Sequence, residues 1–231
     1  TTQIVQRDRH AEFICLLANL ASSLDKFATE IRELQRPEIG ELYEPFERKR
    51  QVGSSTMPHK RNPELCERIC GLAKIMRSLT IPALENVVTW HERDLTQSSA
   101  ERFIIPEACI LIDYMLHLMT FIIENIEVDE ERMLKNLEIT QGRIMSEAVM
   151  IALTRKGMNR QEAHELLRKL AIKSQTENKH FKEVLLENET VRKFLNEREI
   201  EDVLNPRNYL GTAIQQIEKT IQKTKQELNL S

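Results

Sequence analysis

The residues best suited to chemistry lie in one segment, residues 48–63. This segment contains five lysines and arginines and no aspartate or glutamate, in a chain whose formal net charge is −3. Two adjacent hydroxyl groups, those of Ser54 and Ser55, follow Gly53. Positive charge beside hydroxyl groups and a helix N-terminus is suited to binding an anion. A solvated basic loop is the alternative that composition alone also allows.

A serine in this segment could act as a base. A serine hydroxyl is normally a poor base, but a cation and backbone N–H donors that stabilise its alkoxide make it a better one. Lys60 and Arg61 would supply the charge, and the helix expected to begin at Pro63 would supply the N–H groups. On residue chemistry alone, the choice between Ser54 and Ser55 stays open.

The order of residues in the segment resembles a known signature. Residues 53–63 read Gly-Ser-Ser-Thr-Met-Pro-His-Lys-Arg-Asn-Pro, which resembles the signature loop of the fumarase/aspartase superfamily of lyases. The resemblance implies that Ser54 is the general base, which removes a proton from the carbon next to a carboxylate so that fumarate leaves by elimination. It also implies that Ser55, Lys60 and Asn62 hold the substrate carboxylates and the charge developing on them, which places Lys60 with Ser54 among the catalytic residues.

The ending His-Lys-Arg-Asn-Pro is most similar to two families, the adenylosuccinate lyases and the carboxymuconate cycloisomerases. A second block, Trp-His-Glu-Arg-Asp at 90–94, is similar to the pattern by which adenylosuccinate lyases hold the phosphate of their nucleotide. The resemblance assigns that role to Arg93, Ser98 and Arg102, and the fork of an arginine guanidinium suits phosphate oxygens. Taken singly, each arginine would be read as part of a solvated helix face.

Other positions follow from the same resemblance. Arg68 and Gln3 match family positions that contact the nucleotide or the succinyl group. His59 and His91 are not assigned as the acid, because the family's proton donor to the leaving nitrogen is a histidine in an upstream segment. The resemblance covers about the C-terminal half of a family member, and the chain, which opens Thr-Thr-Gln, reads as a piece that begins inside a larger protein. Because each family site is built from three subunits of a homotetramer, we expect this chain alone to be inactive.

Composition limits the other possibilities. The chain has 231 residues, of which 30% are charged and 5% aromatic, which is typical of a helix-rich soluble protein. The slightly acidic balance argues against a general nucleic-acid binder. The four cysteines predict no disulfide framework at this length, and Cys66 and Cys70 fit half-buried thiols on one helix face better than a metal pair. The longest apolar run, residues 109–123, is too short to span a bilayer. We therefore expect a cytoplasmic protein without a metal or cofactor.

Apolar periodicity predicts an all-α fold, a long-helix bundle followed by a small helical domain. Long helices are expected over 3–34, over 63–80 with a shorter piece to 88, and from Ser98, with Glu101 completing a capping box, to about 126. The second domain is expected to hold shorter helices, among them 160–174, opened by Asn159 with Glu162 in a second capping box, and 189–203. The predicted domains are residues 1–139, a partial central bundle that carries the loop 48–63, and residues 140–231.

Two helix faces carry further expectations. The first long helix is predicted to bury a face of mostly large apolar residues: Phe13, Leu16, Leu17, Leu20, Leu24, Phe27, Ala28, Ile31 and Leu34. The helix around Met115 is apolar nearly all round and must be enclosed. One chain offers too few long helices to surround it, so we expect identical chains to complete the bundle.

The resemblance to adenylosuccinate lyases implies the cofactor-free cleavage of adenylosuccinate to AMP and fumarate, and of the analogous succinyl-aminoimidazole-carboxamide ribotide, in purine biosynthesis. One alternative is a related enzyme such as carboxymuconate cycloisomerase. That enzyme has no phosphate to bind, so the 90–102 block argues against it. Another alternative is a catalytically silent helical oligomerisation module. The presence of Ser54, Lys60 and Asn62 together weighs against this alternative.

Overall fold

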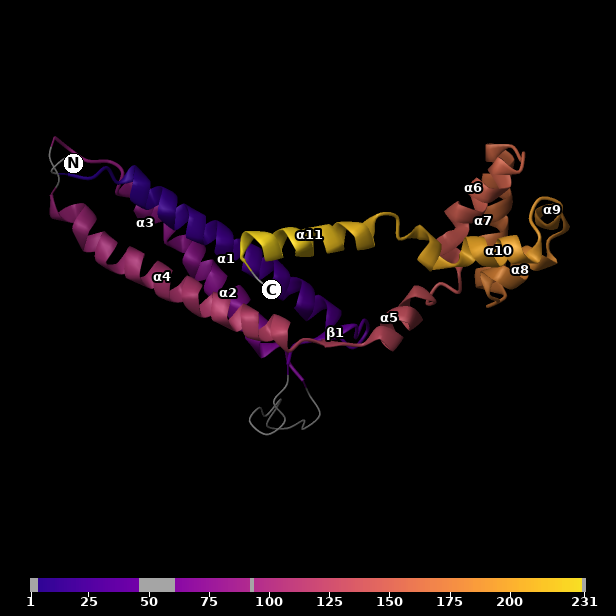
Figure 1. The fold of residues 1–231 in the computed structure, drawn as a ribbon, viewed down its shortest axis with the longest axis horizontal. Helices are drawn as coiled ribbons and strands as arrows, with labels where there is room; N and C mark the ends of the chain where they lie inside the picture. The colour runs from indigo at the N-terminus through magenta and orange to yellow at the C-terminus, as the bar shows by residue number, and fades with distance from the viewer. Residues whose placement is uncertain (1–3, 46–60, 92–93, 230–231) are drawn as a thin grey trace. The chain divides into compact units, whose positions relative to one another are not determined.

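The computed structural model describes residues 4–45, 61–91 and 94–229, and most of them are helical (Figure 1). The prediction of an all-α fold is confirmed: the only strands among these residues are β1 (Leu42–Tyr43) and β2 (Glu127–Val128), which pair antiparallel. The chain divides into two compact units, Thr1–Leu134 and Lys135–Ser231. Each unit has its own hydrophobic core.

Unit 1 is built from long helices that lie side by side (Figure 1). They are α1 (Asp8–Leu34), α2 (Glu64–Ser78) and α4 (Leu95–Glu124), with the short α3 (Thr80–Glu85) continuing from α2. The first helix begins at Asp8, five residues later than expected. Pro63 is the residue before α2 and not its first residue.

Small side chains bring α1 and α2 together. On α1 the residues buried against the core are largely alanines: Ala11, Ala18, Ala21 and Ala28, alongside Ile14, Leu24 and Ile31. The same core contains four buried residues of α2: Cys66, Ile69, Ala73 and Met76. Alanine has the highest helix propensity and allows two backbones to approach closely, so this face favours both the helix and the contact.

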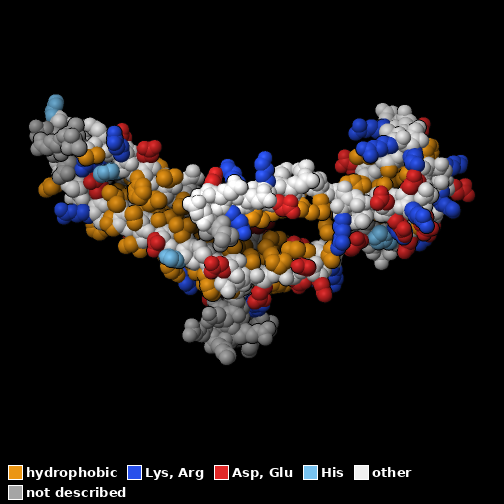
Figure 2. Space-filling view, viewed as in Figure 1, with side chains coloured by type: hydrophobic (Ala, Val, Ile, Leu, Met, Phe, Trp, Pro, Cys, Tyr) orange, Lys and Arg blue, Asp and Glu red, His pale blue; other side chains and the backbone are white. Residues whose placement is uncertain are grey.

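The predicted apolar face of α1 is only partly correct. Leu24, Ala28 and Ile31 are buried, but Phe13, Leu16, Leu20 and Phe27 are exposed. On α4, Phe103 is 79% exposed and Ile110 64% exposed, so this chain alone does not enclose the helix, as expected from its small number of long helices. Apolar periodicity finds apolar side chains without saying what covers them, and here the larger ones face away from the chain's own core. Figure 2 shows hydrophobic side chains gathered on the surface of unit 1.

The start of α4 differs from the expected capping box. Asp94 is the N-cap, and its side chain accepts hydrogen bonds from the backbone N–H and the hydroxyl of Thr96. Because the cap comes four residues before Ser98, that serine lies inside the first turns of the helix. Glu101, the other half of the expected box, instead binds the side chains of Arg7, just before α1, and of His10 in α1.

Helix α4 is also longer than its most apolar run. Within the described residues it is the one helix that is long and apolar enough, by length and composition alone, to cross a membrane, which the run 109–123 did not predict. A third of its most apolar 18-residue stretch, 33%, is buried inside the chain. A core helix of a bundle passes the same test, and α4 packs against both α1 and α2.

A short sheet and a turn connect the end of α4 to the end of α1. Leu42 lies opposite Val128, and Tyr43 lies opposite Glu127. After β2 the chain enters α5 (Glu130–Leu137), where the Arg132 guanidinium donates hydrogen bonds to three main-chain carbonyls of residues 37–39.

Unit 2 is a set of short helices. Its elements are the 3-10 turn η1 (Arg143–Met145), α6 (Ser146–Arg155), α7 (Arg160–Thr176), α8 (Phe181–Glu187), α9 (Glu189–Arg192), α10 (Glu197–Leu204), the 3-10 turn η2 (Pro206–Tyr209) and α11 (Ala213–Glu227). Asn159 caps α7 as expected. The single helix expected over 189–203 is two helices, because Asn196 starts α10 with a reciprocal capping box to Glu199.

We expect Ala21→Leu to destabilise the chain by about 1–3 kcal/mol, because Ala21 is fully buried and a larger side chain there overpacks the contact between α1 and α2. Urea unfolding followed by far-UV circular dichroism measures the effect. The matched control is Ser23→Leu on the exposed side of α1, where a change within about 0.5 kcal/mol is expected. Equal effects of the two substitutions would contradict the role of the alanines.

Candidate active site

The predicted site residues divide into two groups within unit 1. Asn62 and Arg68 lie at the start of α2, and Ser98 and Arg102 lie in the first turns of α4. The remaining assigned residues lie outside the described part of the chain: Gln3, Ser54, Ser55, Lys60 and Arg93. Their assignments stay predictions.

A cavity of about 740 Å³ adjoins the first group. Asn62 lines it, together with Arg32 near the end of α1, Arg36 and Tyr43 in the stretch that follows, and Glu67 of α2. The lining carries both signs of charge, because it also includes Glu33, which pairs with Arg36 at 3.1 Å.

The N-terminus of α2 is not open to an anion in the way that we expected. Glu44, a buried side chain, accepts hydrogen bonds from the backbone N–H groups of Leu65 at 3.1 Å and Cys66 at 3.0 Å. The backbone N–H of Glu64, in the same turn, donates a hydrogen bond to the Asn62 carbonyl. The carboxylate of Glu44 therefore takes the place at the helix N-terminus that we had assigned to a ligand.

The charge of Arg61 is likewise engaged within the chain. Its guanidinium donates two hydrogen bonds to the two carboxylate oxygens of Glu127, at 2.9 and 3.1 Å, and lies 5.4 Å from the centre of the Tyr43 ring. A two-pronged contact of this kind holds the arginine in one orientation. Arg61 therefore contributes to the structure at this end of the unit, and the expectation that its charge serves a ligand is corrected.

Arg68 lies on the exposed face of α2 and donates a hydrogen bond of 2.8 Å to the Tyr114 hydroxyl of α4. This contact fixes its position along the bundle. Tyr114 is twelve residues beyond Arg102 and sixteen beyond Ser98, which corresponds to about 18 and 24 Å along the helix axis at about 1.5 Å per residue. The two groups of assigned residues therefore lie far apart within one chain.

Within the second group, the Ser98 hydroxyl oxygen is buried and has no hydrogen-bond partner among the described residues. Arg102 is exposed. Trp90, which opens the block, is 87% exposed. An unpaired hydroxyl beside an exposed arginine is chemically suited to a phosphate group.

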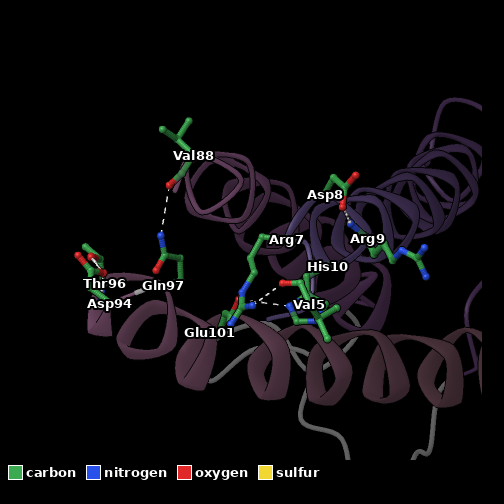
Figure 3. A network of polar contacts seen from close by, with 10 residues as sticks. All are labelled: Val5, Arg7, Asp8, Arg9, His10, Val88, Asp94, Thr96, Gln97 and Glu101. Atoms are coloured by element: carbon green, nitrogen blue, oxygen red, sulfur yellow. Dashed lines mark hydrogen bonds and ion pairs between the residues drawn. The ribbon is translucent and has the colours of Figure 1, made fainter. Parts of the chain in front are cut away.

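A buried ion pair supports this end of α4 (Figure 3). Arg7, just before α1, donates through Nε to Glu101 at 2.7 Å, and a ring nitrogen of His10 lies 3.2 Å from the same oxygen. Arg7 is only 6% exposed, and it also donates to the Val5 carbonyl. Burial by itself would raise the pKa of Glu101, but the hydrogen bonds from Arg7 and His10 outweigh it and the pKa lies below its ordinary value.

Neighbouring Gln97 makes a further tie. Its amide nitrogen donates to the Val88 carbonyl at 3.2 Å, which joins the first turn of α4 to the chain that precedes it (Figure 3). Together, Gln97 and Glu101 hold the stretch that carries Ser98 and Arg102 against two other segments of unit 1.

Several of these supporting residues were not identified from the sequence: Arg7, Glu44 and Glu101 in its observed role. One signal was present. Glu44 stands among Leu42, Tyr43 and Pro45, and an acidic residue in an apolar stretch is seldom buried without partners. The contact between Arg7 and Glu101 joins residues 94 positions apart, so no local pattern could reveal it.

Cys66 and Cys70 are both buried, and burial, together with the Glu44 charge, raises the pKa of the Cys66 thiol. Deprotonation of Cys66 is therefore disfavoured, which agrees with a packing role. Across the described ranges, no cluster of three or more histidine, cysteine, aspartate or glutamate side chains could hold a metal ion.

Comparison with known families and structures defines the class. The family described as Lyase matches residues 1–76, and the family described as Adenylosuccinate lyase C-terminus matches residues 142–220. Among solved structures, the chain superimposes on a 3-carboxy-cis,cis-muconate lactonizing enzyme from Pseudomonas putida with a TM-score of 0.80 and 36% identity, over 90% of this chain and 45% of that one. A β-carboxy-cis,cis-muconate cycloisomerase from Acinetobacter calcoaceticus gives a TM-score of 0.84 at 28% identity, over 96% and 48%. The fold is that of the helical lyases.

Curated relatives narrow this class further. The adenylosuccinate lyase of Methanocaldococcus jannaschii is 48% identical over 225 residues, which are 97% of this chain and 49% of the relative. The adenylosuccinate lyase of Pyrococcus horikoshii is 51% identical over 222 residues, 96% of this chain and 49% of the relative. The chain spans about half the length of these relatives. It belongs to the adenylosuccinate lyase family of the fumarase/aspartase superfamily.

We expect Glu101→Gln to destabilise the chain by about 1.5–3 kcal/mol near pH 7, because it removes a charge-assisted hydrogen bond from nearly buried Arg7. The folded-state pKa of Glu101 is lowered, so its contribution is present above the ordinary value of 4.5 and is lost as pH falls through the folded-state pKa. Urea unfolding of both proteins between pH 7 and pH 3 should therefore give curves that converge at low pH.

The control for this prediction is Glu107→Gln, the same chemical change on an exposed side chain of α4. It should change the unfolding free energy by less than about 0.5 kcal/mol. A Glu101→Gln effect that persists unchanged at the acid end would show that the ion pair is not its source.

Proposed function

We propose that the complete protein is an adenylosuccinate lyase, of which this chain forms about half. Its substrates are adenylosuccinate, split to AMP and fumarate, and the analogous succinyl-aminoimidazole-carboxamide ribotide, so that it serves purine biosynthesis in the cytoplasm without a cofactor. The observation that carries the proposal is identity of 48–51% across nearly the whole chain to relatives of that name, with the signature loop present.

In the proposed reaction, Ser54 removes the proton from the carbon next to a succinyl carboxylate. The electron pair of that C–H bond forms the new double bond, the C–N bond breaks, and the nitrogen leaves with its electron pair and takes up a proton from an acid outside this chain. Ser55, Lys60 and Asn62 bind the carboxylates and the negative charge that develops on them. Donors already in place at the transition state need no reorganisation. The Asn62 position beside the cavity supports this assignment.

Arg93, Ser98 and Arg102 bind the nucleotide phosphate in this proposal, and Arg68 and Gln3 complete the contacts to the substrate. The exposed Arg102 and the unpaired Ser98 hydroxyl support a binding role over a structural one. The described contacts of Arg68 and Tyr114 place Arg68 near the other end of α4. A small nucleotide cannot reach both ends of this helix in one chain.

We therefore propose that the protein is a homotetramer whose active sites combine the loop end of one chain with the Arg102 end of another. The exposed apolar side chains on α1 and α4 support this assembly: Phe13, Leu16, Leu20 and Phe27 on the first helix, and Phe103 and Ile110 on the second. Large apolar patches on a monomer usually mark an interface. An isolated copy of this chain would then be inactive.

The muconate cycloisomerases are the second candidate, because two of the matching structures carry that activity in their names. Parallel assays of the complete protein with adenylosuccinate, argininosuccinate, malate and carboxymuconate decide between the two. Fumarate release from adenylosuccinate alone is the expected result. Turnover of carboxymuconate instead would remove the phosphate assignment, and no turnover of any acid would favour a silent oligomerisation module.

Ser54→Ala should lower the kcat for adenylosuccinate by about 10²–10⁴-fold, because a positioned base contributes about that much. The comparison variant is Ser55→Ala, which removes a hydroxyl next to it in the chain. Steady-state kinetics with the complete protein measures both. A larger loss of kcat for Ser55→Ala would transfer the role of base to Ser55, and a loss of only a few-fold in both variants would exclude a serine base.

Leu16→Asp should reduce the molecular mass of the complete protein in sedimentation equilibrium and lower its activity with it, because the substitution puts a charge into the proposed interface. The control is Asn19→Asp, which adds the same charge one turn along the exposed surface of α1. A mass and activity that stay unchanged in Leu16→Asp would contradict shared sites on this face.

A further inference from the structure

The segment of residues 46–60 is flanked on its upstream side by Glu44, which is only 3% exposed. Both of its carboxylate oxygens accept N–H groups from the first turn of α2, on the downstream side of the same segment. Burial raises the pKa of Glu44, and the N–H groups of Cys66 and Leu65 offset part of that effect. Burying a carboxylate costs free energy unless hydrogen bonds offset the loss of its hydration. Here the hydrogen bonds that do so also join two parts of the chain.

Gln35 also joins the chain before residues 46–60 to the chain after them. It is the C-cap residue of α1 and is 6% exposed. Its amide oxygen accepts the Glu44 backbone N–H at 2.9 Å, and its amide nitrogen donates to the Arg61 carbonyl at 3.3 Å. One side chain therefore binds main-chain groups on both sides of residues 46–60.

A third set of contacts fixes the downstream end. The Arg61 guanidinium is held by both carboxylate oxygens of Glu127, and it lies over the ring of Tyr43. Tyr43 and Glu127 are themselves opposite each other in the two-stranded sheet. The residues before and after 46–60 thus close on one another through side chains of α1, β1, β2 and α2.

We propose that Gln35 and Glu44 are positioning residues for catalysis: they hold together the described residues on either side of 46–60, and so position Asn62 and the two ends of the segment that carries the proposed base. This inference rests on the proposed function. Neither side chain acts on the substrate itself. Their effect follows from geometry, because a displacement of about 1 Å in a reacting group can cost about 10²-fold in rate.

Two nearly isosteric substitutions test the proposal in the complete protein. Glu44→Gln turns one acceptor of α2 N–H groups into a donor that opposes them. Gln35→Glu keeps the acceptor for the Glu44 N–H and places an oxygen against the Arg61 carbonyl. We expect each to lower kcat for fumarate release by about 10–100-fold with KM changed by less than about threefold, in protein that remains folded at the assay temperature by circular dichroism.

The controls carry the same charge changes at exposed positions. Glu30→Gln lies on the exposed side of α1, and Gln175→Glu lies in unit 2. Both should keep kcat within twofold. Gln35→Ala, which removes both hydrogen bonds without adding a charge, replaces either test variant if that variant does not fold.

The decisive readout is a double-substitution cycle with Ser54→Ala. Positioning residues that act through Ser54 have little left to position once it is removed, so adding Gln35→Glu to Ser54→Ala should lower the residual rate by less than about threefold. An equal fall in both backgrounds would mean a general loss of structure and would overturn the proposal. If the unsubstituted protein is active and Gln35→Glu leaves kcat unchanged, the positioning proposal is overturned and the proposed function stands. If the unsubstituted protein does not cleave adenylosuccinate, the proposed function itself is refuted.

Discussion

The close contact between α1 and α2 is the constraint on which the rest of unit 1 depends. Alanines at four buried positions of α1 let the two helices approach, and Ala73 on α2 lies in the same core. Because neighbouring helices pack at a distance set by the side chains between them, small residues here fix the spacing of the bundle. With this spacing, Gln35 at the end of α1 reaches Glu44, Glu44 reaches the start of α2, and Glu101 of α4 reaches Arg7.

The same constraint decides what the surface looks like. Alanines take four of the seven buried positions of α1, while Phe13, Leu16 and Phe27 face outward. On α4, Phe103 and Ile110 are also exposed. Burial of such side chains against another protein surface would be favourable, because removing apolar surface from water is the main driving force of protein association. The exposed apolar surface of unit 1 therefore supports the proposed assembly, in which the predicted site residues along α4 would come from different chains.

Electrostatics at the start of α2 show how a basic segment is built into an apolar bundle. The negative charge that stabilises the helix N-terminus comes from the chain itself, through Glu44, and Arg61 is neutralised by Glu127. Arg36 is likewise paired with Glu33 at 3.1 Å. The positive charge expected to serve a ligand is, by prediction, that of Lys60, with Arg32 in the lining of the cavity. Internal pairing holds the flanks of the segment, and this separates the groups that support the site from the groups that could bind substrate.

By itself the sequence determined the helical class, the approximate extent of the long helices and the family, because these depend on local periodicity and on residues adjacent in the chain. The signature at residues 53–63 and the block at 90–102 are local patterns of this kind. Tertiary structure alone decided which face of α1 is buried, that Ser98 lies inside α4, and that Glu44 occupies the N-terminus of α2. It also decided that Arg68 and Arg102 lie far apart along α4. These outcomes depend on contacts between residues distant in sequence, such as Arg7 with Glu101, and a pattern within one segment carries no information about the segment that packs against it.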